Sequence, residues 1–281
     1  MQPIEVVWWG GQRGSWCQAI VEFLTEGMTH RMAISELQGD GAVFVVKADQ
    51  FQRKSMVVQF HEDTVRLNWM LLIVTANEEI GWPMAYFERT GKFKKWLQTP
   101  HRFQACSRAI PWGWTPGCAT EVRIPKLYDW SFGGQITHSR REEFLKVART
   151  LPAENRMLVT SEGFSQGIAQ GAYYKMLAAT KVAPCPSGPI TVDSMRVCEA
   201  LQNGCVPVVD SVSPTGAYPE YWKRVFGEYH PIPYVSHWQE FPEICAKLLQ
   251  NWPASSPHVS EWYSQWKANL KLALYQDLGA L

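Results

Sequence analysis

Short apolar runs alternate with amphipathic segments along the chain, and this alternation predicts repeated strand–helix units. The clearest apolar runs are residues 4–9, 70–75 and 205–209. Continuous apolar runs of this length are typical of strands in parallel sheets that helices cover on both faces. Residues 15–28 instead place apolar side chains at helical spacing. The pattern therefore predicts an α/β fold.

The first half opens on a strand, a glycine-rich loop at residues 10–15 and a helix, which is how a doubly wound unit begins. Further strand candidates are residues 42–47 and 55–60. The loop has neither the GxGxxG nor the GxxxxGK[ST] spacing, so a dinucleotide site or a P-loop is not expected. Two alternatives remain for it: a tight turn that lets the helix pack, or the lining of a binding cleft.

The most informative stretch is residues 181–209, which predicts a strand, a loop, a helix, a tight turn and a second strand. Thr191 or Asp193 is placed to cap the helix, and Gly204 stands where a helix end favours a left-handed residue. The helix therefore begins at the carboxyl edge of a parallel sheet. Its unpaired N–H groups and partial positive charge suit a phosphate group there.

Arg196 and Glu199 lie one turn apart on this predicted helix. A guanidinium near the helix start would bind a phosphate through two hydrogen bonds, and a carboxylate one turn deeper would accept two ribose hydroxyls. The alternative is an ordinary exposed ion pair at i, i+3 spacing, which helix statistics alone favour.

The order of residues in this stretch resembles the nucleotide-sugar signature of exostosin-type glycosyltransferases. The matching residues are Pro186-Ser187-Gly188, Asp193-Ser194-Met195-Arg196, Glu199-Ala200 and Asn203-Gly204-Cys205-Val206-Pro207-Val208. The resemblance implies that Arg196 binds the diphosphate of a nucleotide-sugar donor, expected to be UDP-linked, and that Glu199 binds its ribose. It also implies contacts to the sugar and phosphates from the loop, through Ser187, Gly188, Asp193 and Ser194.

More broadly, the second half resembles GT-B glycosyltransferases. This implies two Rossmann-like domains facing a central cleft, with a C-terminal helix that crosses back to the first domain. A stretch rich in Pro, Gly and Trp at residues 110–117 marks the boundary. We expect an N-terminal acceptor-side domain at residues 1–118, a nucleotide-sugar-binding domain at residues 119–257 and the crossover helix at residues 258–281.

A second glycine-rich turn follows the strand predicted at residues 128–133, and Ser139 and Glu142 then fit a capping box that starts a helix. Arginines in a first helical turn oppose the helix dipole unless an anion is bound there, which favours a binding role. In the GT-B pattern this turn lies over the diphosphate. The resemblance therefore implies donor contacts from this turn: Gly134, His138, Arg140 and Arg141.

The composition narrows the expected partners. Of 281 residues, 46% are hydrophobic, and the formal net charge is only +1, which gives no overall attraction to nucleic acid or to an anionic membrane. The 7 cysteines form no CxxC pair, which is typical of reduced thiols in a cytoplasmic protein. No apolar run has membrane-spanning length. Because exostosin relatives are membrane-anchored, we expect a compact microbial or viral form, monomeric in the host cytoplasm.

No Asp-x-Asp motif and no His or Cys cluster with metal spacing occurs, so we expect a donor site that uses neither a metal ion nor another cofactor. Thr191 stands where retaining relatives often carry a second Glu, which favours inversion. Inverting transfer needs a base for the acceptor hydroxyl. The candidates follow two predicted strands and are, in order, Glu78, Glu79, His61 and Asp63. The alternative for each is a solvated loop residue.

The most basic local stretch, residues 92–102, alternates lysines with aromatic side chains. Such a segment would stack bases and bind phosphates; the alternative is an ordinary solvated amphipathic segment. With the first glycine-rich loop and the tryptophans of the hinge, it supplies the candidate acceptor-binding residues: Gly11, Gln12, Trp16, Lys94, Lys95, Trp96, Trp112 and Trp114.

Three hypotheses remain for what the protein does. The favoured one is sugar transfer to a hydroxymethylated pyrimidine in DNA, namely 5-hydroxymethylcytosine, as in viral DNA glycosyltransferases that share the GT-B fold; the target base would be flipped out of the duplex. The second is transfer to a saccharide in surface-polysaccharide synthesis, which needs no basic surface. The third is a non-catalytic protein that binds a nucleotide sugar or an acceptor.

Overall fold

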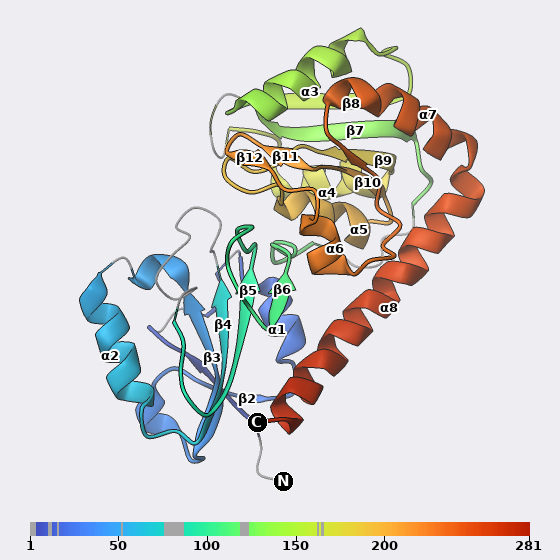
Figure 1. Ribbon diagram of the computed structural model, residues 1–281. Helices are drawn as coiled ribbons and strands as arrows, with labels where there is room; N and C mark the ends of the chain where they lie inside the picture. Colours follow the sequence, from blue (N-terminus) through green and yellow to red (C-terminus); the bar gives the residue numbers. More distant parts are fainter. Residues whose placement is uncertain are drawn as a thin grey trace. The chain divides into compact units, whose positions relative to one another are not determined.

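The computed structural model describes residues 4–10, 13–15, 17–51, 53–75, 87–118, 124–161, 163 and 166–281. The chain divides into two compact units (Figure 1). The first unit comprises Met1–Pro116 together with Lys267–Leu281, and the second comprises Gly117–Trp266.

The first unit is built on a parallel sheet with the strand order β2-β1-β3-β4-β5-β6. Its strands are β1 (Glu5–Trp8), β2 (Thr29–Arg31), β3 (Gly41–Lys47), β4 (Trp69–Thr75), β5 (Lys92–Gln98) and β6 (Arg108–Ile110). Its helices are α1 (Ala19–Leu24) and α2 (Lys54–Thr64), with 3-10 turns η1 (Ile34–Glu36) and η2 (Ala48–Phe51). The chain order reverses between β1 and β3, as in a doubly wound fold.

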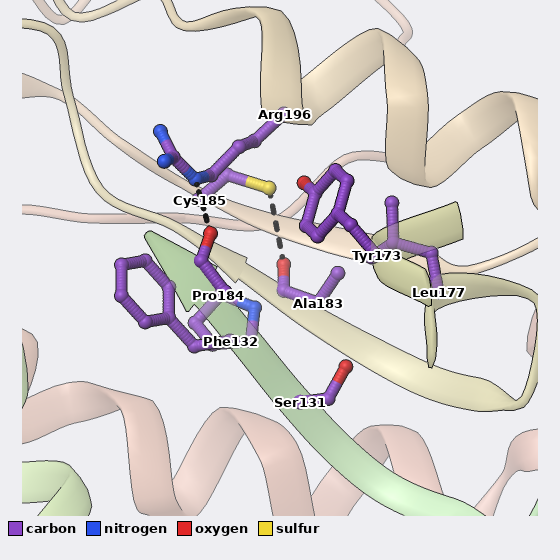
Figure 2. Close-up of a pocket in the computed structure, with 9 residues that line it drawn as sticks. Ser131, Phe132, Tyr173, Leu177, Ala183, Pro184, Cys185 and Arg196 are labelled. Atoms are coloured by element: carbon purple, nitrogen blue, oxygen red, sulfur yellow. Dashed lines mark hydrogen bonds between the residues drawn. The ribbon is translucent and has the colours of Figure 1, made fainter. Parts of the chain in front are cut away.

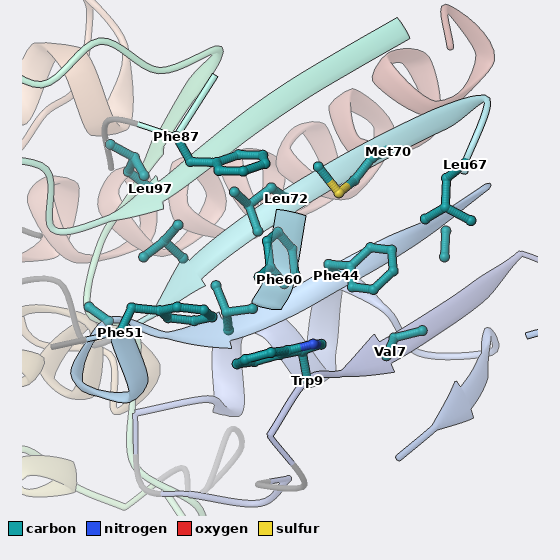
Figure 3. Close-up of a cluster of buried hydrophobic side chains, with 14 residues drawn as sticks. Val7, Trp9, Phe44, Phe51, Phe60, Leu67, Met70, Leu72, Phe87 and Leu97 are labelled. Atoms are coloured by element: carbon teal, nitrogen blue, oxygen red, sulfur yellow. The ribbon is translucent and has the colours of Figure 1, made fainter. Parts of the chain in front are cut away.

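Aromatic side chains fill the core under α2 (Figure 3). The ring of Trp9 stacks on Phe51 at 4.7 Å between centroids, and Phe60 meets Trp9 and Phe44 edge-on. Residues 42–46 and 70–74 are buried at every position. Because both faces of these central strands are covered, their sequences read as continuous apolar runs.

Two elements of the first unit differ from the sequence-based expectation. Residues 55–60 form part of helix α2 and not a strand; Met56, Val57 and Phe60 pack on the core at helical spacing, while Val58 is exposed. The β-branched valines favour a strand by local propensity, but the packing of this segment against the core overrides that propensity. Residues 92–98 form strand β5, between β4 and β6, and not a solvated surface segment.

The second unit has a five-stranded parallel sheet with the order β13-β10-β9-β7-β8. Its strands are β7 (Tyr128–Gln135), β8 (Arg156–Ser161), β9 (Thr180–Cys185), β10 (Val206–Asp210) and β13 (Tyr234–Val235); β11 (Val212–Ser213) and β12 (Gly216–Ala217) form a small hairpin. Its helices are α3 (Ser139–Thr150), α4 (Gln170–Ala178), α5 (Met195–Gln202), α6 (Tyr221–Phe226), η4 (Trp238–Glu240) and α7 (Phe241–Gln250).

Helices α3 and α7 lie on one face of this sheet, and α4 and α5 lie on the other (Figure 1). On the first face, Phe144, Trp238 and Phe241 pack together with Trp130 of β7. The chain runs outward from β7 to β8 and then returns to β9 on the other side of β7. This reversal is a topological switch point, the position where open α/β sheets bind ligands at the carboxyl ends of their strands.

The last helix, α8 (Trp252–Gly279), is continuous, and its residues from Lys267 onward group with the first unit. None of the helices in the described parts of the chain has the length and apolarity needed to span a membrane. Two Rossmann-like α/β units define the GT-B fold class, so the fold predicted from the sequence is confirmed.

Candidate functional site

The start of α5 lies at the switch point of the second unit, next to the carboxyl ends of β7, β9 and β10. Ser194, and not Thr191 or Asp193, is the N-cap residue; its backbone is extended (φ −151°, ψ 150°) and its hydroxyl makes no capping hydrogen bond. By helix geometry, the N–H groups of Met195 and Arg196 have no intrahelical partner. The first turn is therefore able to bind an anion. At the other end, Gly204 has the predicted positive φ, +67°.

Arg196 is held in place by the end of β7. Its Nε donates a hydrogen bond to the carbonyl of Gly133 at 3.0 Å, and its guanidinium lies 5.5 Å from the ring centroid of Phe132 (Figure 2). A Cβ atom on Gly134 would lie 2.2 Å from Nη2 of Arg196. The absence of a side chain at Gly134 therefore makes room for the guanidinium, whose Nε contact leaves the two terminal nitrogens available to a ligand.

A small pocket lies next to Arg196, lined by Phe132, Tyr173, Leu177 and Cys185 (Figure 2). It contains about 180 Å³ of empty space, including space open to solvent. Burial raises the pKa of the Cys185 thiol well above its ordinary value, so this sulfur is an uncharged wall atom. The gaps between its lining atoms are too narrow to admit even a water molecule, so in this structure the pocket does not itself accommodate a ligand.

Glu199 is only 3% exposed and lies one turn below Arg196. The hydroxyl of Tyr174 donates a hydrogen bond to its Oε1 at 3.4 Å, and Gln170 in turn donates to that hydroxyl at 2.9 Å. This burial excludes the solvated surface ion pair that helix statistics favoured. Burial, followed by the Glu199 charge, raises the pKa of the nearby Tyr173 phenol.

The loop after β9 is held from several sides. The hydroxyls of Ser213 and Thr215, in the β11–β12 hairpin, both donate to the carbonyl of Ile190, at 2.8 and 2.6 Å. The hydroxyl of Tyr221 on α6 donates to Oδ2 of Asp193 at 2.7 Å. The loop is therefore pre-organised by elements that follow it in the chain, which lowers the entropy cost of binding a ligand.

Asp210, at the end of β10, is the centre of a buried network beneath this loop. Its carboxylate accepts hydrogen bonds from the backbone N–H of Ser187 and the indole of Trp238, both at 3.1 Å, and is ion-paired with Arg140. Burial raises the pKa of Asp210, against the lowering effect of Arg140. Arg140 also binds Glu143 and the carbonyl of Ser236.

These contacts correct the expected role of Arg140. Arg140 is 7% exposed, and its guanidinium is engaged by protein groups, so in this structure it holds the loop and is not presented to a ligand. Arg141 is 6% exposed, and its Nη1 donates to the carbonyl of Gln135 at 3.1 Å. The helix that carries both begins at Ser139 with His138 as its N-cap residue, and no side chain caps it, so the predicted capping box does not form.

Several buried polar atoms around the loop have no hydrogen-bond partner. They are the hydroxyls of Ser187, Thr191 and Ser194 and both ring nitrogens of His138. Buried polar groups are normally paired, because leaving one unpaired costs about 1–3 kcal/mol. Unpaired groups collected at a switch point are therefore the groups a bound ligand would pair. Gly188 contributes backbone to the same loop, where its N–H donates to the carbonyl of Asp193 at 3.0 Å.

The candidate general bases are not brought together at a strand end in the described chain. Glu78 and Glu79 lie outside the described residues. His61 and Asp63 lie in the last turn of α2, the helix that connects β3 to β4, and not after a strand. Asp63 accepts hydrogen bonds from Trp9 and Gln59 at 3.1 and 3.0 Å. The predicted position of His61 and Asp63 was therefore wrong, because their segment was read as a strand.

The candidate acceptor-binding residues are likewise not brought together into one site among the described residues. Gly11, Gln12 and Trp16 lie outside the described residues. Trp96 is fully buried, and its indole donates to Asp277 at 2.8 Å, so it offers no face to a base. Lys95 is buried, and its ammonium binds Glu88. Neither side chain is presented to an acceptor in this structure, so these contacts give no support to the predicted acceptor-binding role of the two residues.

The remaining acceptor candidates have partners within the first unit. Lys94 is half-buried, and its Nζ lies 3.6 Å from Oδ1 of Asp277. Trp112 is buried, and its carbonyl accepts a hydrogen bond from Gln98 at 2.7 Å. Trp114 is half-buried, with Phe23 against its edge and Lys267 over its ring. Of the two tryptophans, Trp114 is the more exposed.

Sequence reasoning missed the positioning residues of the site. Asp210, Phe132 and Tyr174 contact the predicted donor residues, but each is separated from its partners by 23 to 70 positions in the chain. The available signal was an acid directly after an apolar strand, which Asp210 provides. In the described residues, no group of three or more His, Cys, Asp or Glu is placed to hold a metal ion.

The two Rossmann-like units place the protein in the GT-B fold class, and the uncapped start of α5 beside Arg196 is its candidate ligand site. The family model of the RXYLT1 C-terminal domain matches residues 117–279, which include the whole of the second unit. The chain belongs to this family of exostosin-like glycosyltransferases, and the resemblance stated from the sequence is confirmed to that extent. The comparison with curated proteins found no match.

Proposed function

We propose that the protein transfers a sugar from a nucleotide-sugar donor, with UDP as the expected carrier, to a hydroxyl of an acceptor. One observation carries the proposal: Arg196 presents its guanidinium at the uncapped start of α5, with the buried carboxylate of Glu199 one turn below it. A diphosphate fits the cation and the N–H groups, and a ribose fits the carboxylate.

The proposed reaction inverts the anomeric centre. A base removes the proton of the acceptor hydroxyl, the acceptor oxygen bonds to the anomeric carbon, and the bond from that carbon to the diphosphate oxygen breaks. The electron pair leaves with the nucleoside diphosphate. Arg196 and the first-turn N–H groups of α5 stabilise that negative charge by electrostatics. Glu78 and Glu79 remain the first candidates for the base.

The acceptor class is a separate part of the proposal. The burial of Trp96 and the pairing of Lys95 with Glu88 favour the other acceptor class, because a DNA acceptor was expected in part from these two side chains. A saccharide acceptor needs no basic surface and agrees with the net charge of +1. We therefore propose a saccharide hydroxyl as the acceptor, with 5-hydroxymethylcytosine in DNA as the competing hypothesis.

A transfer assay tests the proposal. The protein is incubated with UDP-sugars and either oligosaccharides or DNA that contains or lacks 5-hydroxymethylcytosine, and products are identified by mass. A mass gain on an oligosaccharide supports the saccharide acceptor; a gain on the modified nucleoside supports the DNA acceptor instead. Binding of a UDP-sugar with neither transfer nor hydrolysis would contradict an enzymatic role.

The matched variants are Arg196→Ala and Arg149→Ala; Arg149 is an exposed arginine in the last turn of α3. Because Arg196 stabilises the leaving group, we expect Arg196→Ala to lower kcat about 10²–10³-fold. Arg149→Ala should leave kcat unchanged. Equal activity of the wild type and Arg196→Ala would overturn the assignment.

A further inference from the structure

His138 lies between the end of β7 and the start of α3, at the edge of the candidate donor site. It is the N-cap residue of α3, and its carbonyl accepts the N–H groups of Arg141 and Glu142 at 3.0 and 3.1 Å. Its side chain makes no capping hydrogen bond. The backbone of His138 therefore starts the helix, while the imidazole is left for another purpose.

Both ring nitrogens of His138 are buried, and neither makes a hydrogen bond of good geometry; the Ser187 backbone lies close enough to one of them to favour the charged ring. A neutral imidazole has one donor and one acceptor, so burying both unpaired is costly unless a ligand completes the site. The Ser187 backbone interacts with the ring, and the Ser187 hydroxyl is also unpaired. The ring therefore adjoins the loop that the donor phosphates are proposed to contact.

The charges around His138 are mainly positive. Arg140 and Arg141 lie on α3, and Arg196 lies on α5; each acts on the ring electrostatically. Arg140 is itself paired with two carboxylates, Asp210 on β10 and Glu143 on α3. Burial first, and then Arg141, lower the pKa of His138 from its ordinary 6.5 to about 4. At neutral pH the ring of the empty site is therefore uncharged.

We propose that His138 takes up one proton from solvent when a diphosphate binds to this site, and that the resulting imidazolium donates a hydrogen bond to a phosphate oxygen. The inference rests on the proposed function, because the diphosphate is taken to be that of the donor. It goes further by making donor binding a proton-coupled event at one named side chain.

The physical reason is a change in the sign of the local charge. A bound diphosphate brings negative charge against the arginines and the ring, and a nearby opposite charge favours the charged imidazolium. The ring then has two N–H donors and pairs a nitrogen that is otherwise unsatisfied. At pH values between the pKa of His138 in the empty site and its higher pKa in the complex, the affinity for the diphosphate should rise as the pH falls. The rise is at most tenfold per pH unit for one proton.

Isothermal titration calorimetry with UDP-glucose tests this, because its diphosphate does not itself titrate near neutral pH. Titrations at pH 6.5 in buffers of different ionisation enthalpy give the number of protons taken up. We expect an uptake approaching one proton for the wild type and for His237→Gln, an exposed histidine of the same unit. We expect no uptake for His138→Gln. Binding of UDP-glucose to the wild type without uptake would overturn the proposal.

A second measurement uses the wild type alone, in case His138→Gln is poorly folded. The ¹⁵N NMR chemical shifts of histidine side chains distinguish a neutral imidazole from an imidazolium. One histidine, which we assign to His138, should become charged when UDP-glucose is added. If UDP-glucose does not bind, the proposed nucleotide-sugar donor fails, and pyrophosphate becomes the probe. A charged ring with pyrophosphate would then support proton uptake on its own, whereas rings that all stay neutral would refute it.

Discussion

The geometry of Arg196 depends on a residue that has no side chain. The guanidinium occupies the space next to Gly134, where a Cβ atom would lie 2.2 Å from Nη2, and is held by Gly133 and Phe132. The sequence identified Arg196 and Gly134 separately, from a signature and from a turn. Their contact follows only from the fold, because they are far apart in the chain.

Gly134→Ala tests this contact without removing any charge. We expect the added methyl group to displace the guanidinium and to weaken UDP binding about tenfold or more, since misplacing an anchoring group costs much of its interaction. Gly171→Ala is the matched control, because a Cβ there meets nothing within 4 Å. Calorimetric titration of both variants with UDP is the measurement. Equal affinity of Gly134→Ala and the control would contradict the assigned role of the turn.

His138 also makes a prediction about stability. Its pKa is about 4 in the folded protein and near 6.5 when unfolded, so between these values the unfolded chain binds the proton more readily. The contribution of His138 to stability is therefore present above pH 6.5 and is lost as the pH falls toward 4. Urea unfolding from pH 7 to pH 4 should show a smaller loss for His138→Gln than for the wild type. Parallel curves would contradict the lowered pKa.

At the scale of elements, the loop after β9 is positioned by β10, α3, α6 and the β11–β12 hairpin. Asp210 joins the loop to α3 through Ser187 and Arg140. Since the carboxylate is fully buried and accepts several hydrogen bonds, removing its charge leaves the buried guanidinium of Arg140 with Glu143 as its remaining carboxylate partner.

We therefore expect Asp210→Asn to lower the free energy of unfolding by about 3–5 kcal/mol, the usual cost of breaking a buried ion pair. Asp129→Asn is the control, because the pair of Asp129 with Lys181 is half-exposed and should contribute about 1 kcal/mol or less. Urea denaturation of both variants measures the difference. A loss at Asp210 no larger than that at Asp129 would show that the network does not hold the loop.

A comparison of individual elements shows which parts of the fold can be predicted from the sequence. The strand–loop–helix–strand at residues 181–209 was predicted because its signals are local: an apolar run, turn residues and a glycine at the helix end. The sequence predicts a strand where α2 lies, because the valines of this segment favour β structure and its apolar side chains follow helical spacing over only a few residues. The network of Asp210 joins residues 23 to 70 positions apart, and no local pattern encodes such a pairing.

At the scale of the whole molecule, each of the two units repeats the same architecture, a parallel sheet covered by helices. The predicted donor residues all belong to the second unit, and the family match covers that unit completely. We therefore expect nucleotide binding to be a property of the second unit.

Hydrogen exchange on the full chain tests this division. With saturating UDP, we expect slower exchange in residues 133–141 and 186–197, because a bound ligand suppresses local opening where it makes contact. Strands β3 and β4 of the first unit should exchange at unchanged rates. Protection restricted to the first unit would contradict the assignment of the donor to the second.

The most direct measurement is a crystal structure of the protein with bound UDP. We predict that the diphosphate lies within hydrogen-bond distance of the terminal nitrogens of Arg196 and of the first N–H groups of α5, with the ribose hydroxyls on Glu199. A diphosphate bound elsewhere, or the start of α5 closed by protein side chains while UDP is bound, would contradict it.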